Sequence, residues 1–225
     1  MNYINNFITK VENKEFRVLR AFLNESTPLF QSFSISNVEN SKSLIIFGKN
    51  VSGKTLIGKL LQGSAQQDNV SVRNCSMGIR TSSGTGKALI YGDESEQSTG
   101  ATSVKVLELC IKSSLKDEGE SIIILDEPDL GLSPKYSRAL GKFIAKKINN
   151  ADDDKFITIV SHNAVFLKAF NSFLDIKSSY VGINTEESLD EWVNSDEIAD
   201  IDSLLSLSDM DTQKWKAIQR AIKAP

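Results

Sequence analysis

Three short apolar runs constrain the fold of this chain more than any other feature of its sequence. They are residues 43–47 (SLIIF), 121–125 (SIIIL) and 156–160 (FITIV). Runs of this length and composition are typical of strands that are buried on both faces. Segments with helical spacing of apolar residues follow them or lie between them, at residues 54–61, 102–115, 135–148 and 164–173. The alternation predicts an α/β fold with a largely parallel sheet covered by helices on both faces.

Less regular patterns predict the structure of the remaining segments. An amphipathic helix is expected over residues 6–24, and a loosely alternating strand over residues 29–38. Residues 62–100 are polar and rich in Gly and Ser, with two short strand candidates at 70–73 and 88–91.

Charge is distributed unevenly along the chain. The sequence holds 26 Lys and Arg against 29 Asp and Glu, a net charge of −3. Between Ser178 and Gln213 there is no Lys or Arg but ten acidic residues, and removing them from the net charge of −3 leaves +7 on the rest. They are Glu186, Glu187, Asp190, Glu191, Asp196, Glu197, Asp200, Asp202, Asp209 and Asp211. This block is either a solvated appendage or a docking segment for a basic partner, whereas the basic body could attract DNA.

Residues 48–55, which follow the first apolar run directly, carry the strongest chemical signal. Their sequence, GKNVSGKT, matches the phosphate-binding pattern Gly-x-x-x-x-Gly-Lys-Thr. Backbone N–H groups of such a loop and the N-terminus of the next helix cradle phosphates, while Lys54 reaches the β- and γ-phosphates and Thr55 ligates Mg²⁺. The expected phosphate-binding residues are Gly48, Lys49, Asn50, Val51, Ser52, Gly53, Lys54 and Thr55. A second glycine-rich segment at 84–87 lacks the leading Gly and the hydroxyl, and is interpreted as a polar turn.

The second and third apolar runs end in residues suited to catalysis. Asp126 and Glu127 follow residues 121–125, and His162 follows residues 156–160. Carboxyl ends of parallel strands form the ligand-binding edge of an open α/β sheet. Asp126 is therefore expected to join the Mg²⁺ ligands, and Glu127 to orient or deprotonate a water molecule. His162 is either an ordinary imidazole or a hydrogen-bond partner of the γ-phosphate or the water.

In this order, the loop, SIIILDEP and IVSH resemble the ATP-binding-cassette class of P-loop ATPases. The closest likeness is to its soluble branch, which contains the ATPase domains of overcoming-lysogenization-defect (OLD) nucleases and the chromosome-maintenance and break-repair ATPases. The resemblance implies that Asp126 binds Mg²⁺, that Glu127 is the catalytic carboxylate and that His162 is the switch residue. The segment DLGLSP is similar to that branch's E-x-G-L-H-P but carries Ser133 instead of His.

The class also has a signature loop, which contacts the γ-phosphate bound by the opposite subunit. The best candidate here is residues 97–101, in which Ser98 and Gly100 match; an ordinary capped helix start is the alternative interpretation. The gap between Thr55 and Ser98 is too short for the helical subdomain of transporters. We therefore expect an ATPase domain over residues 1–180, with a shortened insertion at 62–100, and a partly helical acidic appendage over 181–225.

The motifs predict an ATPase that uses ATP and Mg²⁺. The resemblance implies that it forms a homodimer around ATP, drives a partner protein or a DNA transaction, and is associated with a phage, plasmid or defence system. The alternative is a low-turnover, ATP-dependent module that holds an effector. A small-molecule kinase is disfavoured because residues 62–100 hold only Arg73 and Arg80. The absence of an apolar run near 18 residues, of a signal peptide and of a cysteine framework predicts a cytoplasmic protein without a membrane span.

Overall fold

The computed structural model describes residues 2–22, 29–76, 99–196 and 199–223. Three sequence-based expectations lie outside these residues: the polar turn at 84–87, the strand at 88–91 and the position of Ser98.

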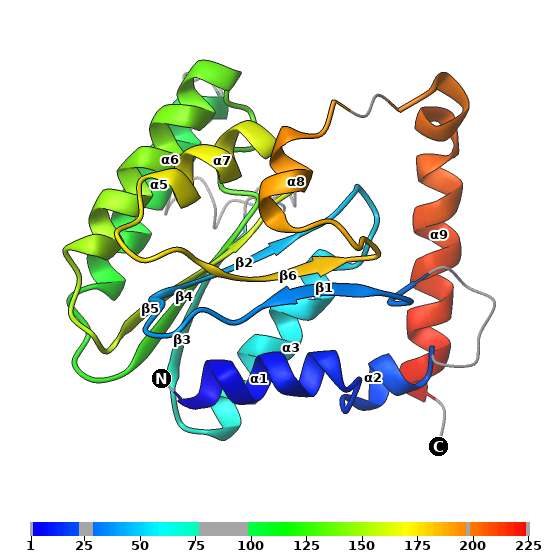
Figure 1. The fold of residues 1–225 in the computed structure, drawn as a ribbon, viewed down its shortest axis with the longest axis horizontal. Helices are drawn as coiled ribbons and strands as arrows, with labels where there is room; N and C mark the ends of the chain where they lie inside the picture. Colours follow the sequence, from blue (N-terminus) through cyan, green and yellow to red (C-terminus); the bar gives the residue numbers. More distant parts are fainter. Residues whose placement is uncertain (1, 23–28, 77–98, 197–198, 224–225) are drawn as a thin grey trace, which may run out of the picture.

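A six-stranded sheet forms the centre of the molecule (Figure 1). In spatial order its strands are β1 (Phe33–Ser36), β6 (Ser179–Ile183), β2 (Ser43–Phe47), β5 (Lys155–Val160), β4 (Ser121–Asp126) and β3 (Ser71–Ser76). All neighbours pair in parallel except β1, which runs antiparallel to β6. The three apolar runs became β2, β4 and β5, so the predicted α/β class with a mostly parallel sheet is confirmed.

Helices cover both faces of the sheet, and one apolar cluster lies between the sheet and the helices on each face. One cluster includes residues of α1 (Asn2–Glu12), α2 (Arg17–Arg20), α3 (Lys54–Gln67) and α9 (Ile201–Lys223). The other includes residues of α5 (Thr99–Ser114), α6 (Pro134–Asn149), α7 (Ala164–Ser172) and α8 (Leu189–Asn194). Leu44 and Ile46 of β2 point into the first cluster and Ile45 and Phe47 into the second, which explains why the run is apolar throughout.

The N-terminal segment differs from its prediction as one long helix. It forms two helices, α1 and α2, because α1 ends in a left-handed residue, Lys14, with φ 51°. The N–H of Lys14 donates to the Val11 carbonyl and that of Glu15 to the Lys10 carbonyl. This is the pattern of a Schellman C-cap, which terminates a helix and turns the chain.

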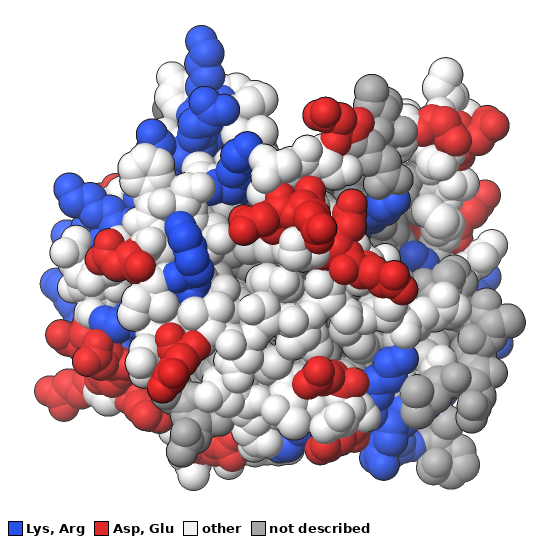
Figure 2. All heavy atoms as spheres, in the orientation of Figure 1, with Lys and Arg blue, Asp and Glu red and all other residues white. Residues whose placement is uncertain are grey.

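The C-terminal part of the chain contributes to both clusters. The boundary expected after residue 180 falls within β6, an inner strand that the sequence patterns did not predict because Ser, Tyr and Gly interrupt its apolar residues. Beyond it, Leu189 of α8 packs into one cluster and Ala217 and Ile218 of α9 into the other. Acidic side chains gather over α8 and over the N-terminal half of α9, and basic ones over the region of α5 to α7 (Figure 2). Within the described ranges no helix has the length and hydropathy needed to cross a bilayer.

Two helical glycines provide a test of how tightly the helices pack. A Cβ at Gly141 of α6 would lie 2.7 Å from the Phe166 carbonyl oxygen and 2.8 Å from the Phe170 nitrogen, both in α7. Gly141→Ala should therefore lower the free energy of unfolding by about 1–3 kcal/mol in urea denaturation. Gly63→Ala in α3, where no described atom lies within 4 Å of the added Cβ, should raise it by up to about 1 kcal/mol. A shift of both variants in the same direction would contradict this packing.

Candidate functional site

The expected site residues meet at one edge of the sheet. Strands β2, β5 and β4 are adjacent and parallel, so their carboxyl ends lie side by side. The loop of residues 48–53, called the glycine-rich loop below, follows β2 and leads into α3. Asp126 is the last residue of β4, and His162 follows β5 by two residues. Strands β4 and β5, which precede Glu127 and His162, pair directly with each other in parallel.

The glycine-rich loop is held in a conformation that requires glycine at two positions. Gly48 and Gly53 have φ values of 148° and 97°, a region that residues with a side chain rarely adopt. A Cβ at Gly48 would lie 2.8 Å from the Ile183 carbonyl oxygen, and one at Gly53 would lie 2.6 Å from Phe30 Cζ. The loop therefore packs directly on β6 and on a buried aromatic ring, and its shape depends on both contacts.

Lys54 begins α3 and turns its ammonium group back into the loop. Its Nζ donates hydrogen bonds to the carbonyls of Gly48, at 3.1 Å, and Lys49, at 2.8 Å. Only 6% of the residue is exposed. Burial lowers the pKa of Lys54 to about 8, although the carboxylates of Glu127 and Asp126 act in the opposite direction. The loop thus holds a buried cation next to two acids.

The hydroxyls of Thr55 and Ser76 converge on the Asp126 carboxylate, close to Lys54. Thr55 Oγ1 lies 3.5 Å from Asp126 Oδ1, and Ser76 Oγ, at the end of β3, lies 3.4 Å from Asp126 Oδ2. Burial raises the pKa of Asp126, and the two hydroxyls oppose that rise. Hard oxygen donors of this kind fit Mg²⁺. Among the described residues no group of three His, Cys, Asp or Glu could hold a metal alone, so a cation here would need further oxygens from a ligand or water. Ser76 was missed by the sequence analysis, which placed the strand at 70–73.

Glu127 and His162 form a second pair at the same edge. His162 Nδ1 lies 3.1 Å from Glu127 Oε1, and both side chains are partly exposed. This hydrogen bond lowers the pKa of Glu127, although burial opposes it, so the carboxylate is ionised at neutral pH. Glu127 has a left-handed backbone, φ 51°, and its N–H donates to the Val160 carbonyl at 2.8 Å. Glu127 is therefore held to β5 through its backbone and to the segment after β5 through its side chain.

Behind this pair lies a buried network that joins the ends of β4 and β5. Asp129 accepts hydrogen bonds from Ser161 Oγ, at 3.3 Å, and from Asn163 Nδ2. Asn163 Oδ1 in turn accepts the Phe166 N–H and so caps α7. Burial raises the pKa of Asp129, and the hydrogen bond from Asn163 opposes that rise. The network fixes the two segments that carry Glu127 and His162.

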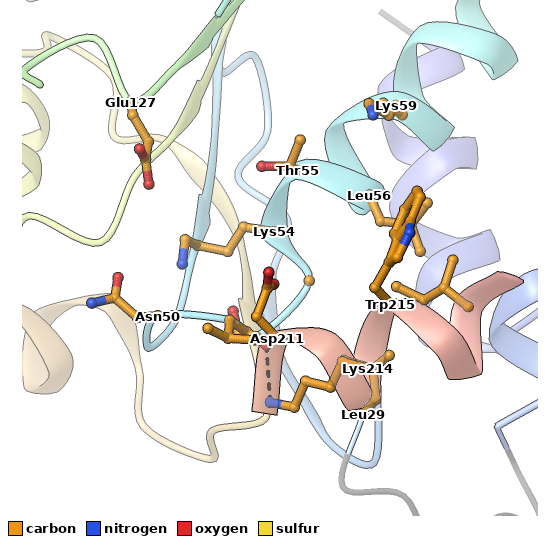
Figure 3. A pocket seen from close by; sticks show the side chains of 14 residues that line it. Leu29, Asn50, Lys54, Thr55, Leu56, Lys59, Glu127, Asp211, Lys214 and Trp215 are labelled. Carbon is orange, nitrogen blue, oxygen red and sulfur yellow. Dashed lines mark hydrogen bonds between the residues drawn. The ribbon is translucent and has the colours of Figure 1, made fainter. Parts of the chain in front are cut away.

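A cavity of about 280 Å³ lies over the glycine-rich loop (Figure 3). Lys54 and Glu127 lie at one end, and Trp215 of α9 lies beside Leu56 at the other. Helix α9 contributes Asp211, Lys214 and Trp215 to this cavity, which the sequence patterns did not predict. The one available signal was Lys214 itself, the first basic residue after the acidic block.

The other expected binding residues lie at different places. Asn50, Val51 and Ser52 line the cavity, and Lys49 is exposed beside it. Gly100 lies in the first turn of α5, whereas Ser98 is outside the described residues.

Phe30, whose ring lies against Gly53, is 1% exposed and packs with Phe22 and Phe33 in the core. Gln62, Gln66 and Gln67 lie along α3, and Gln62 accepts a hydrogen bond from Asn74.

No family model matches this chain, and a search of curated proteins finds no relative. The chemistry of the site therefore follows from its geometry: a loop with a buried cation, an oxygen cluster suited to a divalent cation, and an ionised carboxylate paired with an imidazole.

The lowered pKa of Lys54 predicts a pH-dependent stability. Between the folded value of about 8 and the unfolded value of about 10.4, only the unfolded chain keeps the proton. Through this group, the free energy of unfolding therefore rises with pH across that window. Lys54→Met should stabilise the chain by about 1–2 kcal/mol at pH 7, after the loss of the two hydrogen bonds to the loop carbonyls is subtracted. At pH 9.5 the same substitution should hardly stabilise the chain, because most of the cost of burying the charge is then absent.

Urea denaturation at both pH values measures this difference. Lys112→Met, an exposed position in α5, is the matched control and should change the free energy of unfolding by less than about 0.5 kcal/mol at either pH. An equal effect of Lys54→Met at pH 7 and pH 9.5 would contradict a burial-shifted ammonium.

Proposed function

We propose that this chain is a Mg²⁺-dependent ATPase of the P-loop type, similar to the soluble branch of the ATP-binding-cassette class. The observation that carries the proposal is the position of Lys54, a buried ammonium at the end of a cavity whose wall also contains Thr55 and Glu127. Asp126 lies within hydrogen-bonding reach of Thr55. A cation, oxygen ligands for Mg²⁺ and an ionised carboxylate are the groups that phosphoryl transfer to water requires.

Each group has a defined role in the proposed reaction. The phosphates bind the N–H groups of the glycine-rich loop and the N-terminus of α3, and Lys54 pairs with the terminal phosphate oxygens. Thr55 and Asp126 are the residues that would hold Mg²⁺, which neutralises charge on the phosphates when bound. Glu127 accepts a proton from the attacking water, and the hydrogen bond to His162 orients its carboxylate.

The resemblance extends the proposal to a homodimer that closes around ATP. In such an assembly, the segment of Ser98 and Gly100 contacts the nucleotide bound by the other subunit. ATP then joins the subunits because each terminal phosphate gains donors from the facing chain. The work driven by this cycle is proposed to act on a partner protein or on DNA, and the acidic C-terminal part offers a docking surface for a basic partner.

Glu127→Gln tests the proposal because it removes the base and keeps the shape of the side chain. We expect ATP hydrolysis, followed as phosphate release, to fall at least about 100-fold while ATP still binds. The variant should elute as a dimer in gel filtration with ATP and Mg²⁺. Glu118→Gln, an exposed glutamate before the opposite end of β4, is the matched control and should behave as the wild type.

Two outcomes would change the proposal. A Glu127→Gln variant that stays monomeric with ATP and Mg²⁺ would exclude the dimer cycle. Stoichiometric retention of ATP by the wild type, without repeated phosphate release, would instead support the low-turnover binding module.

A further inference from the structure

The wall of the cavity opposite the glycine-rich loop comes from α9. Its residues Asp211, Lys214, Trp215 and Ile218 have the spacing i, i+3, i+4, i+7 and therefore share one helix face. All four line the same cavity as the loop. Ile218 is buried in the apolar cluster beneath, so the helix is anchored there, while the residues one and two turns earlier face the cavity.

A hydrogen bond fixes α9 to the loop itself. Lys214 Nζ donates to the Val51 carbonyl at 2.9 Å, between residues 163 positions apart (Figure 3). Burial lowers the pKa of Lys214, and the nearby Asp211 carboxylate opposes this. Because these two charges partly compensate each other, the wall adds little net charge, and Lys54 and the loop amides remain the anion-binding groups.

Trp215 is the large apolar residue of this wall that is not buried in the core. It is 55% exposed, although a large aromatic ring is usually well covered, and it lies in the apolar end of the cavity with Leu56 and Leu29. Lys54 and Glu127 lie at the other end (Figure 3). The cavity therefore has the two ends that a nucleotide requires: charged groups for phosphates and an aromatic face for a base.

We propose that α9 forms the base-binding wall of the nucleotide site and that Trp215 stacks on the purine base of a bound nucleoside triphosphate. This inference rests on the proposed function and adds a specificity-determining residue to it. Contact between the base and the indole face increases the affinity for the nucleotide, whereas binding of the phosphates does not depend on this contact. Stacking favours purines over pyrimidines because the larger ring covers more of the indole.

The experiment compares two probes, ATP and inorganic tripolyphosphate, both with Mg²⁺, by isothermal titration calorimetry. Trp215→Ala should weaken ATP binding about tenfold or more and change tripolyphosphate binding less than about twofold. Trp215→Phe, which keeps an aromatic ring, should restore most of the ATP affinity. Lys54→Met should weaken both probes. Tyr136→Ala, an exposed aromatic residue of α6, is the control and should change neither.

Fluorescence provides a direct readout of the contact. The chain has two tryptophans, and Trp192 packs against Phe47 on the other face of the sheet. In a Trp192→Phe background, Trp215 is the single indole, and its emission should change on titration with ATP but not with tripolyphosphate.

The outcomes separate the two proposals. If the wild type binds both probes and Trp215→Ala binds ATP as tightly as the wild type, or loses both probes equally, base stacking is overturned while the ATPase proposal stands. If the wild type binds neither probe, both proposals fail.

Discussion

The arrangement of the site depends on the burial of one ammonium group. Lys54 takes two carbonyls of its own loop as partners, and these contacts hold residues 48 and 49 over the start of α3. A buried cation is unfavourable unless acceptors and opposite charges surround it. The sheet order meets this requirement in part, because only β5 separates the end of β2 from the end of β4, where Asp126 and Glu127 lie, and burial still lowers the pKa of Lys54. The order of the strands therefore also determines which charges surround Lys54.

Much of the fold could be predicted because the central strands are buried on both faces. Such strands appear in the sequence as unbroken apolar runs, and β2, β4 and β5 were predicted almost to the residue. The prediction failed where local hydrogen bonds or neighbouring strands determine the secondary structure. The Schellman cap at Lys14 divides the first helix without any apolar signal. Strand β6 contains Ser, Tyr and Gly, and it is held in the sheet by pairing with β1 and β2.

The candidate site was predictable for residues that directly follow a strand. Asp126, Glu127 and His162 are placed by the strands before them, and parallel pairing brings them to one edge. The contribution of α9 could not be predicted in the same way. Helical periodicity indicates which face of α9 is apolar, but not where the helix lies on the rest of the molecule. Lys214 and Trp215 meet a loop that lies more than 160 positions earlier, a contact that only the tertiary structure specifies.

The left-handed backbone of Glu127 sets a limit on how this region can be improved. A residue with a side chain in that conformation is strained by roughly 1 kcal/mol or more, and glycine would relieve the strain. Glycine would also remove the carboxylate that pairs with His162. Selection for thermal stability and selection for the proposed role of this carboxylate therefore favour different residues at this one position. Any gain in stability that keeps the Glu127 carboxylate has to come from elsewhere in the chain, for example from exposed helix positions such as Gly63.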